Sequence, residues 1–145
     1  MRQNLKAYKK VNIESTLLTS NPHQVILMMY DGALQNMFNA KGAIERSDLS
    51  LKSETITKAI NIFNALRNSL DFESQPAISK NFDDLYSYCV NKLVDISVTL
   101  KSDEIDEVVA LIKPVRDAWA EMPEAGKQEG LQLLKEKNAE LVTGE

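Results

Sequence analysis

The segment 22-PHQVILMMYDGALQNMFNAKGAIER-46 carries a clear helical pattern of apolar residues. Its apolar side chains recur in alternating steps of four and three residues, at Ile26, Tyr30, Ala33, Met37, Ala40 and Ile44. This spacing places them on one face of an α-helix. Asn21 is a residue type that caps helices, and Pro22 suits the first helical position. The pattern predicts an amphipathic helix over about 22–46, and its apolar face must pack against other helices.

Three further stretches, at about 50–70, 76–100 and 103–122, repeat this period. Their inward positions are predicted to be Ile56, Ala59, Phe63, Leu66 and Leu70, then Ile78, Phe82, Leu85, Cys89, Leu93 and Ile96, then Ile105, Val108, Val109, Ile112, Val115 and Trp119. Ser102 is expected to cap the last helix, and Pro114 to kink it without ending it.

Short loops make neighbouring helices antiparallel. The sequence therefore predicts an all-α fold, an antiparallel up-down four-helix bundle over 21–122. An N-terminal arm (1–20) precedes it and an acidic C-terminal tail (123–145) follows. The leucines of the tail leave two alternatives open, a short fifth helix or a frayed end.

Composition narrows the classes of function. One cysteine, Cys89, excludes a disulfide framework or a cysteine-based zinc site, and one histidine, His23, argues against histidine metal sites and histidine-based catalysis. The sequence has no glycine-rich phosphate loop. The net charge of −4 disfavours nucleic acid, and the longest apolar run, 25–30, is far shorter than a membrane span. We expect a soluble cytoplasmic protein that is not an enzyme and that uses no cofactor or metal.

Two groups of apolar residues are left over once the helical faces are assigned. At about 100° per residue, the first helix carries one group away from Tyr30, and the third helix carries the other opposite Leu85. These groups are Val25, Met28, Met29 and Gly32 on the first helix, and Val90, Val94 and Val98 on the third. Either the arm and tail cover them, or they form grooves for an apolar partner segment, whose backbone could approach closely at Gly32.

Three tyrosines are further candidates for contact with a partner segment. Tyr86 and Tyr88 flank the inward face of the third helix, where they are either edges of the core or contacts for a partner. Tyr8, with Val11 and Ile13, gives the arm apolar side chains, so the arm could act as a displaceable lid over a neighbouring groove.

Several short motifs, taken in order, resemble the FliS family of flagellar secretion chaperones. They are AYKKV at 7–11, TSNP at 19–22, MMYDG at 28–32, KAINI at 58–62, NFDDLYSY at 81–88 and RDAW at 116–119. The resemblance covers about residues 7–122. It includes Tyr8, Met28, Met29, Gly32, Tyr86 and Tyr88, whereas the valines rest on helical geometry alone.

The resemblance implies an antiparallel helical bundle that binds the disordered C-terminal segment of flagellin in the cytoplasm. Binding would prevent premature polymerisation and keep flagellin competent for type III export, with the arm around Tyr8 as a lid. Contact with the flagellar export apparatus is left open. Two rival interpretations are a bundle that self-associates through its apolar stripes when free of partner, and a phosphorelay bundle that uses His23.

Overall fold

The computed structural model of the chain describes residues 21–122 and holds four helices there. They are α2 (Pro22–Glu45), α3 (Leu49–Asn68), α4 (Pro76–Thr99) and α5 (Asp103–Ala120). Every helix lies within two residues of its predicted bounds, and residues 21–122 contain no strand. The all-α prediction is confirmed. The predicted arm and tail lie outside the described residues.

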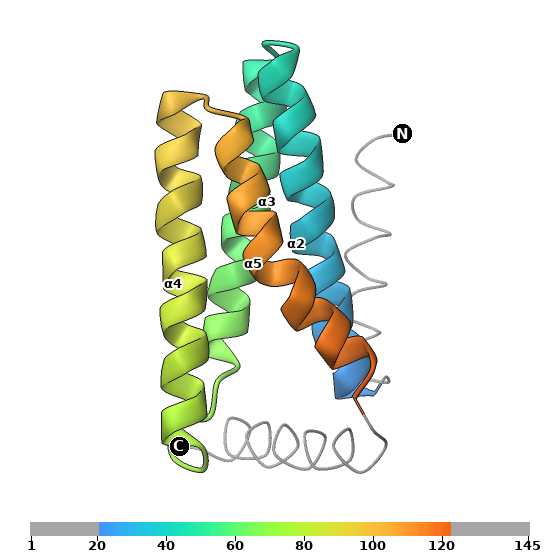
Figure 1. Cartoon of the computed structure of the whole chain (residues 1–145), viewed down its shortest axis with the longest axis vertical. Coiled ribbons are helices and arrows are strands. Elements are labelled where there is room, and N and C mark those ends of the chain that lie inside the picture. Colours follow the sequence, from blue (N-terminus) through green and yellow to red (C-terminus); the bar gives the residue numbers. More distant parts are fainter. Residues whose placement is uncertain (1–20, 123–145) are drawn as a thin grey trace, which may run out of the picture. The chain divides into compact units, whose positions relative to one another are not determined.

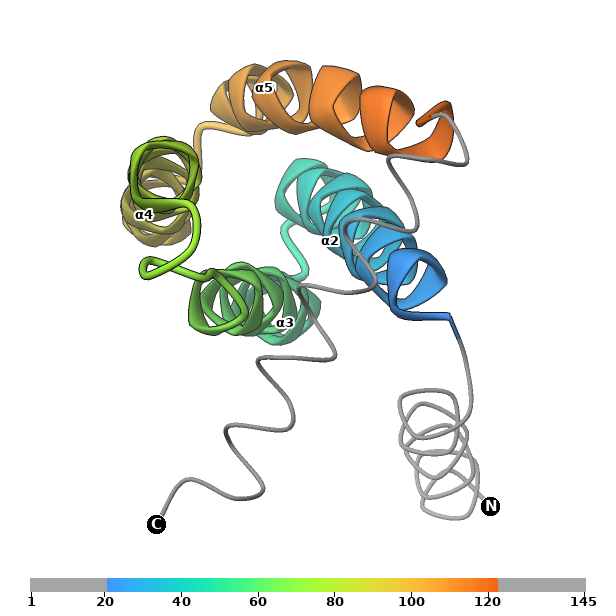
Figure 2. The same cartoon turned by 90° about the horizontal axis from the view of Figure 1, so that it is seen from below.

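The helices alternate in direction, as predicted. Met29–Met122 is one compact unit that holds most of α2 with α3, α4 and α5, and residues 21–28 belong to a second unit. Figure 1 shows the chain running up α2, down α3, up α4 and down α5, and Figure 2 shows these helices around a common interior. Ion pairs fix the antiparallel register of α2 and α5, because Asp31 binds Arg116 at 2.7 Å and Lys41 binds Asp106 at 2.9 Å.

Local signals explain where the helices begin. The Asn21 side chain accepts a hydrogen bond from the backbone N–H of His23 at 2.9 Å, so the predicted cap of α2 forms. Asp48 caps α3 in the same way. The prediction that Ser102 caps α5 with its side chain is wrong. Ser102 already has helical backbone angles (φ −61°, ψ −30°), whereas a capping side chain needs an extended backbone. Helix α5 continues through Pro114 to Ala120, as predicted.

The core contains one row of side chains from each helix. Its buried apolar members are Tyr30, Ala33, Met37, Ala40 and Ala43 of α2, Ile56, Ala59, Phe63 and Leu66 of α3, Tyr86, Cys89, Leu93 and Ile96 of α4, and Ile105, Val108 and Ile112 of α5. Predicted positions that are only half-buried are Ile26, Ile44, Leu70, Phe82, Leu85, Val109, Val115 and Trp119. Most of them lie near the helix ends, where fewer neighbouring helices cover them.

One predicted core position is wrong. Ile78, near the start of α4, is 53% exposed, and Ser79 and Tyr86 are buried in its place. Ile96 lies five whole turns after Ile78 on the same face of α4 and is fully buried, so the exposure of Ile78 is local to the first turn of the helix.

Polar contacts join the helices at their margins. Arg67 of α3 binds Asp83 of α4 at 2.8 Å, and Lys52 of α3 donates a hydrogen bond to the Ser97 carbonyl at 3.1 Å. Such partly exposed ion pairs contribute at most about 1 kcal/mol each. Burial of the apolar rows is therefore the main source of stability, and the pairs mainly fix the register.

Candidate functional site

The thiol of the single cysteine is buried in the core. Burial raises the pKa of Cys89 to about 12, so the thiol stays protonated at neutral pH and is a poor nucleophile. Within residues 21–122 no group of three or more histidine, cysteine, aspartate or glutamate side chains could hold a metal ion.

His23 lies in the first turn of α2 and is buried. A phosphorelay histidine must be exposed to receive a phosphoryl group. The placement of His23 therefore weighs against the phosphorelay interpretation.

The predicted valine stripe of α4 lies on the surface. Val98 is 80% exposed and Val94 is also exposed, while Val90 is half-buried. Tyr88 of the same helix is exposed as well. A bundle helix ordinarily carries polar residues on its outer face. The described residues nevertheless leave the apolar side chains of Val94 and Val98 uncovered there.

The predicted apolar residues on α2 differ from one another in exposure. Met28 is exposed, whereas Val25 and Met29 are half-buried. Gly32 does not provide a site for a partner's backbone: a Cβ atom there would lie 3.3 Å from Cδ1 of Ile62 in α3. Its small size serves the close packing of α2 on α3, and the expectation of a partner contact at Gly32 is wrong.

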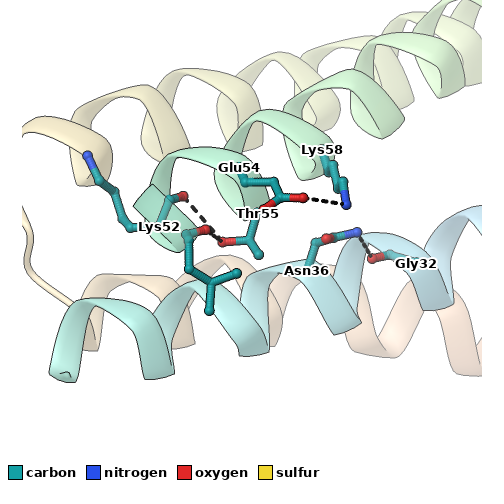
Figure 3. A network of polar contacts seen from close by, with 7 residues as sticks. Gly32, Asn36, Lys52, Glu54, Thr55 and Lys58 are labelled. Carbon is teal, nitrogen blue, oxygen red and sulfur yellow. Dashed lines mark hydrogen bonds and ion pairs between the residues drawn. The ribbon is translucent and has the colours of Figure 1, made fainter. Parts of the chain in front are cut away.

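The contacts around Gly32 agree with this assignment. Figure 3 shows Gly32 and Asn36 on α2, with the Asn36 side chain donating a hydrogen bond to the Gly32 carbonyl at 2.8 Å. Thr55 is buried, and its hydroxyl donates to the Leu51 carbonyl one turn earlier at 2.7 Å. Polar groups on this face are thus satisfied within their own helices, which lets α2 and α3 approach each other.

Tyr86 is also placed differently from its prediction. It is 3% exposed, and its hydroxyl oxygen lies 2.6 Å from that of Tyr30 across the bundle. The expectation that Tyr86 forms an edge contact for a partner is wrong in this arrangement, because its side chain is enclosed by the core. Tyr8, the remaining predicted contact, lies outside the described residues.

Helical periodicity did not predict several of the exposed apolar residues, and Ile78 and Phe38 are two of them. Ile78 of α4 was assigned to the core, and Phe38 of α2, which is 72% exposed, was not considered. A signal for Phe38 existed: it follows Met37 directly, so it points about 100° away from the buried row.

Near the turn between α3 and α4 lies an open hollow of about 420 Å³. It is lined by Asn64, Arg67, Asn68, Phe72 and Asp83. Polar and charged groups dominate these walls, and the ion pair of Arg67 with Asp83 joins two of them. The hollow is therefore not part of the apolar surface.

None of the four described helices is long and apolar enough to cross a lipid bilayer. Exposed apolar side chains gathered on helix faces mark surfaces that bind other protein chains. The fold and these surfaces thus define a helical protein-binding module.

Comparison with known proteins identifies the family of this helical protein-binding module. The family described as "Flagellar protein FliS" matches residues 3–126. The flagellar secretion chaperone FliSB of Pseudomonas aeruginosa is 36% identical, covering 79% of this chain and 91% of that protein. The flagellar secretion chaperone FliS of Salmonella typhimurium is 35% identical (86% and 94% covered), and that of Vibrio cholerae is 32% identical (85% and 90%). The chain belongs to the FliS family of flagellar secretion chaperones.

Proposed function

We propose that this chain binds the disordered C-terminal segment of flagellin in the cytoplasm. By covering that segment it prevents premature polymerisation and keeps flagellin competent for type III flagellar export. Membership of a family of flagellar secretion chaperones supports a flagellar protein as the partner. The observation that carries the proposal is the uncovered row of Val94 and Val98 on α4.

Physical chemistry favours an apolar and initially disordered partner. A segment that folds on binding loses conformational entropy, so it must bury a large apolar area to bind well. Exposed valines and Tyr88 on a rigid helix offer that area, and their burial contributes about 25 cal/mol per Å². An amphipathic segment that lays its apolar face on α4 would satisfy both requirements.

A polymerisation assay tests this function. Monomeric flagellin is mixed with filament seeds, and growth is followed by light scattering with and without the chain. We expect an equimolar amount of the chain to suppress growth. Flagellin lacking its C-terminal segment is the control in a separate pull-down, where it should not be retained. Undiminished growth in a molar excess of folded chain would refute the proposed role.

The same exposed surface favours a second candidate, self-association. Val98 is exposed enough to pair with a second copy of the chain when no partner is present. Sedimentation velocity at two concentrations distinguishes the candidates. A mass that rises with concentration, and that falls when Val98 is replaced by lysine, would support self-association. A constant monomer mass would exclude it.

A further inference from the structure

The two halves of α5 are buried to different extents. The first half, residues 103–113, contributes three fully buried side chains, those of Ile105, Val108 and Ile112. In the second half, residues 114–120, every side chain is either half-buried or exposed. Because burial of apolar side chains is the main source of stability in the bundle, the second half is held less firmly than the first.

The backbone of α5 is also weakened where the two halves meet. Pro114 has no N–H group to donate to the carbonyl of Ala110, so one hydrogen bond of the helix is missing there. Helices bend preferentially at such a proline. The helix nevertheless continues to Ala120. Pro114 is therefore a natural hinge between the two halves.

Ion pairs hold the first half of α5 to two neighbouring helices. The ammonium group of Lys92 in α4 lies 3.5 Å from a carboxylate oxygen of Glu104 and 3.5 Å from one of Glu107. Toward α2, Asp106 binds Lys41 at 2.9 Å. These contacts all precede Pro114, so bending at the hinge would leave them intact.

The second half of α5 is joined to α2 by a different ion pair. Figures 1 and 2 show that α5 starts beside the end of α4 and moves away from it along its length. Beyond the hinge, Nε of Arg116 lies 2.7 Å from Oδ1 of Asp31 in α2. Arg116 also binds Asp117 at 3.2 Å, but Asp117 belongs to the same half of α5 and moves with it. The contact with Asp31 is therefore the one of the two that resists opening.

We propose that residues 114–120 form a flap that detaches from α2 at Pro114 while residues 103–113 stay in place, and that the Asp31–Arg116 ion pair sets how often the flap opens. The two residues of the pair come from the MMYDG and RDAW motifs, which lie 85 positions apart in the sequence. The flap is a property of the free chain and does not depend on which partner the chain binds.

Opening of the flap would change the apolar surface of the chain. Val115 and Trp119 lie within about 60° of the buried Ile112 around the helix, so they are on the side of α5 that faces the bundle. Both are half-buried when the flap is closed. Detachment of the flap exposes them, so the open state presents two apolar side chains that the closed state partly covers.

Hydrogen exchange of the backbone amides of the full chain, followed by NMR, measures this opening. A detached segment as short as residues 114–120 does not keep a helix by itself, so its amides exchange when the flap opens. Arg116→Gln removes the ion pair. Since a partly exposed pair contributes little stability, we expect the amides of residues 115–120 to exchange about fivefold faster. The amides of residues 105–112 should stay within about twofold of the unmodified chain.

Two variants serve as controls for Arg116→Gln. Lys113→Gln removes the same charge at an exposed position before the hinge, and it should leave exchange in the flap unchanged. The amide of Leu93, which is fully buried in α4, reports global unfolding and should not change in any variant. Asp31→Asn removes the other partner of the pair and should accelerate exchange in the flap about fivefold as well.

The double variant Asp31→Asn with Arg116→Gln tests whether the two residues act as a pair. It should exchange no faster than either single variant, because each single change already removes the same contact. Multiplied effects, about 25-fold in total, would show that the two residues act separately and would overturn the role of the pair.

Two further results bear on the flap itself. Equal acceleration of residues 105–112 and 115–120 in Arg116→Gln would mean that α5 detaches as one unit and would overturn the hinge at Pro114. Unchanged exchange in residues 115–120 would mean that the ion pair does not hold the flap. Salt gives an independent check, because 1 M NaCl screens exposed charges beyond about 3 Å. It should accelerate exchange in the flap of the unmodified chain but not in Arg116→Gln, and an equal response of both would contradict the proposal.

Discussion

Replacing Val98 with lysine separates the proposed binding surface from the fold. Val98 lies one residue before the end of α4, and its side chain is 80% exposed. Fully burying a valine side chain contributes about 1.5–3 kcal/mol. Since only a fifth of Val98 is covered, the folded chain loses about 0.3–0.6 kcal/mol on substitution.

The charge of the new lysine offsets this loss of stability. A positive charge in the last turn of a helix gains about 0.3–1 kcal/mol from the helix dipole. The two effects nearly cancel, so the free energy of unfolding should change by less than about 0.5 kcal/mol and Tm by less than about 4 °C.

Binding should respond much more strongly. A partner that covers the remaining four fifths of Val98 gains about 1.2–2.4 kcal/mol there. Losing that contact alone weakens binding roughly 8- to 60-fold. Removing water from the lysine ammonium adds to the loss, so the lower figure is a minimum.

The assay combines thermal unfolding, followed by circular dichroism, with calorimetric titration of a flagellin C-terminal peptide. Thr99→Lys is the matched control, because it adds the same charge at the same helix end on an exposed residue about 100° around the helix. We expect the control to bind like the unmodified chain. Equal affinity of both variants would refute the assignment of Val98 to the binding surface, and a large drop in Tm for Val98→Lys would show that Val98 supports the fold.

Three further predictions test the core and the helix contacts. Phe63→Ala should lower the free energy of unfolding by about 3–5 kcal/mol, measured by urea titration, because the ring is fully buried. Gly32→Ala should leave peptide affinity unchanged, because position 32 faces Ile62 of α3. The fold should tolerate the change, since alanine favours the helix by about 1 kcal/mol and this offsets the tight contact with Ile62. Reduced affinity at constant Tm would show instead that Gly32 contacts the peptide. The raised pKa of Cys89 means that the unfolded chain loses this proton from about pH 9 while the folded chain keeps it to about 12. Stability is therefore full below pH 9 and falls by about 2 kcal/mol by pH 10.5, and a Cys89→Ala variant that falls as steeply would contradict this cause.

Helix periodicity was enough to predict most of the fold. The rows on α3 and α5 follow the expected steps of three and four, since each helix buries one stripe and leaves the rest to solvent. The exposure of Val94 and Val98 followed from the same geometry, because a four-residue step opposite the core keeps side chains on the outer face.

Periodicity did not predict that Tyr86 is buried or that Ile78 is exposed. Ile78 is more hydrophobic than Tyr86, so the pattern placed Ile78 inside. The hydrogen bond between the Tyr30 and Tyr86 hydroxyls joins residues 56 positions apart, and helical spacing carries no information about such a pair. A buried tyrosine needs a partner for its hydroxyl, and only the packed bundle shows that Tyr30 supplies it.

Gly32 illustrates a second limit. A helix in a bundle contacts neighbours on two flanks, so a position far from the central row can still face another helix. Gly32 lies on the flank toward Ile62 of α3, which a wheel centred on Tyr30 cannot distinguish from an exposed side. The exposure of the proposed contact residues was therefore best predicted on the outer face of α4, and least well on the flanks of α2.

Calorimetric titration of the folded chain with the C-terminal segment of flagellin, at several temperatures, tests the proposed binding itself. We predict a one-to-one complex with a large negative heat-capacity change, because the segment folds while burying apolar surface. Absence of binding by a chain shown to be helical by circular dichroism would contradict the proposed binding of flagellin.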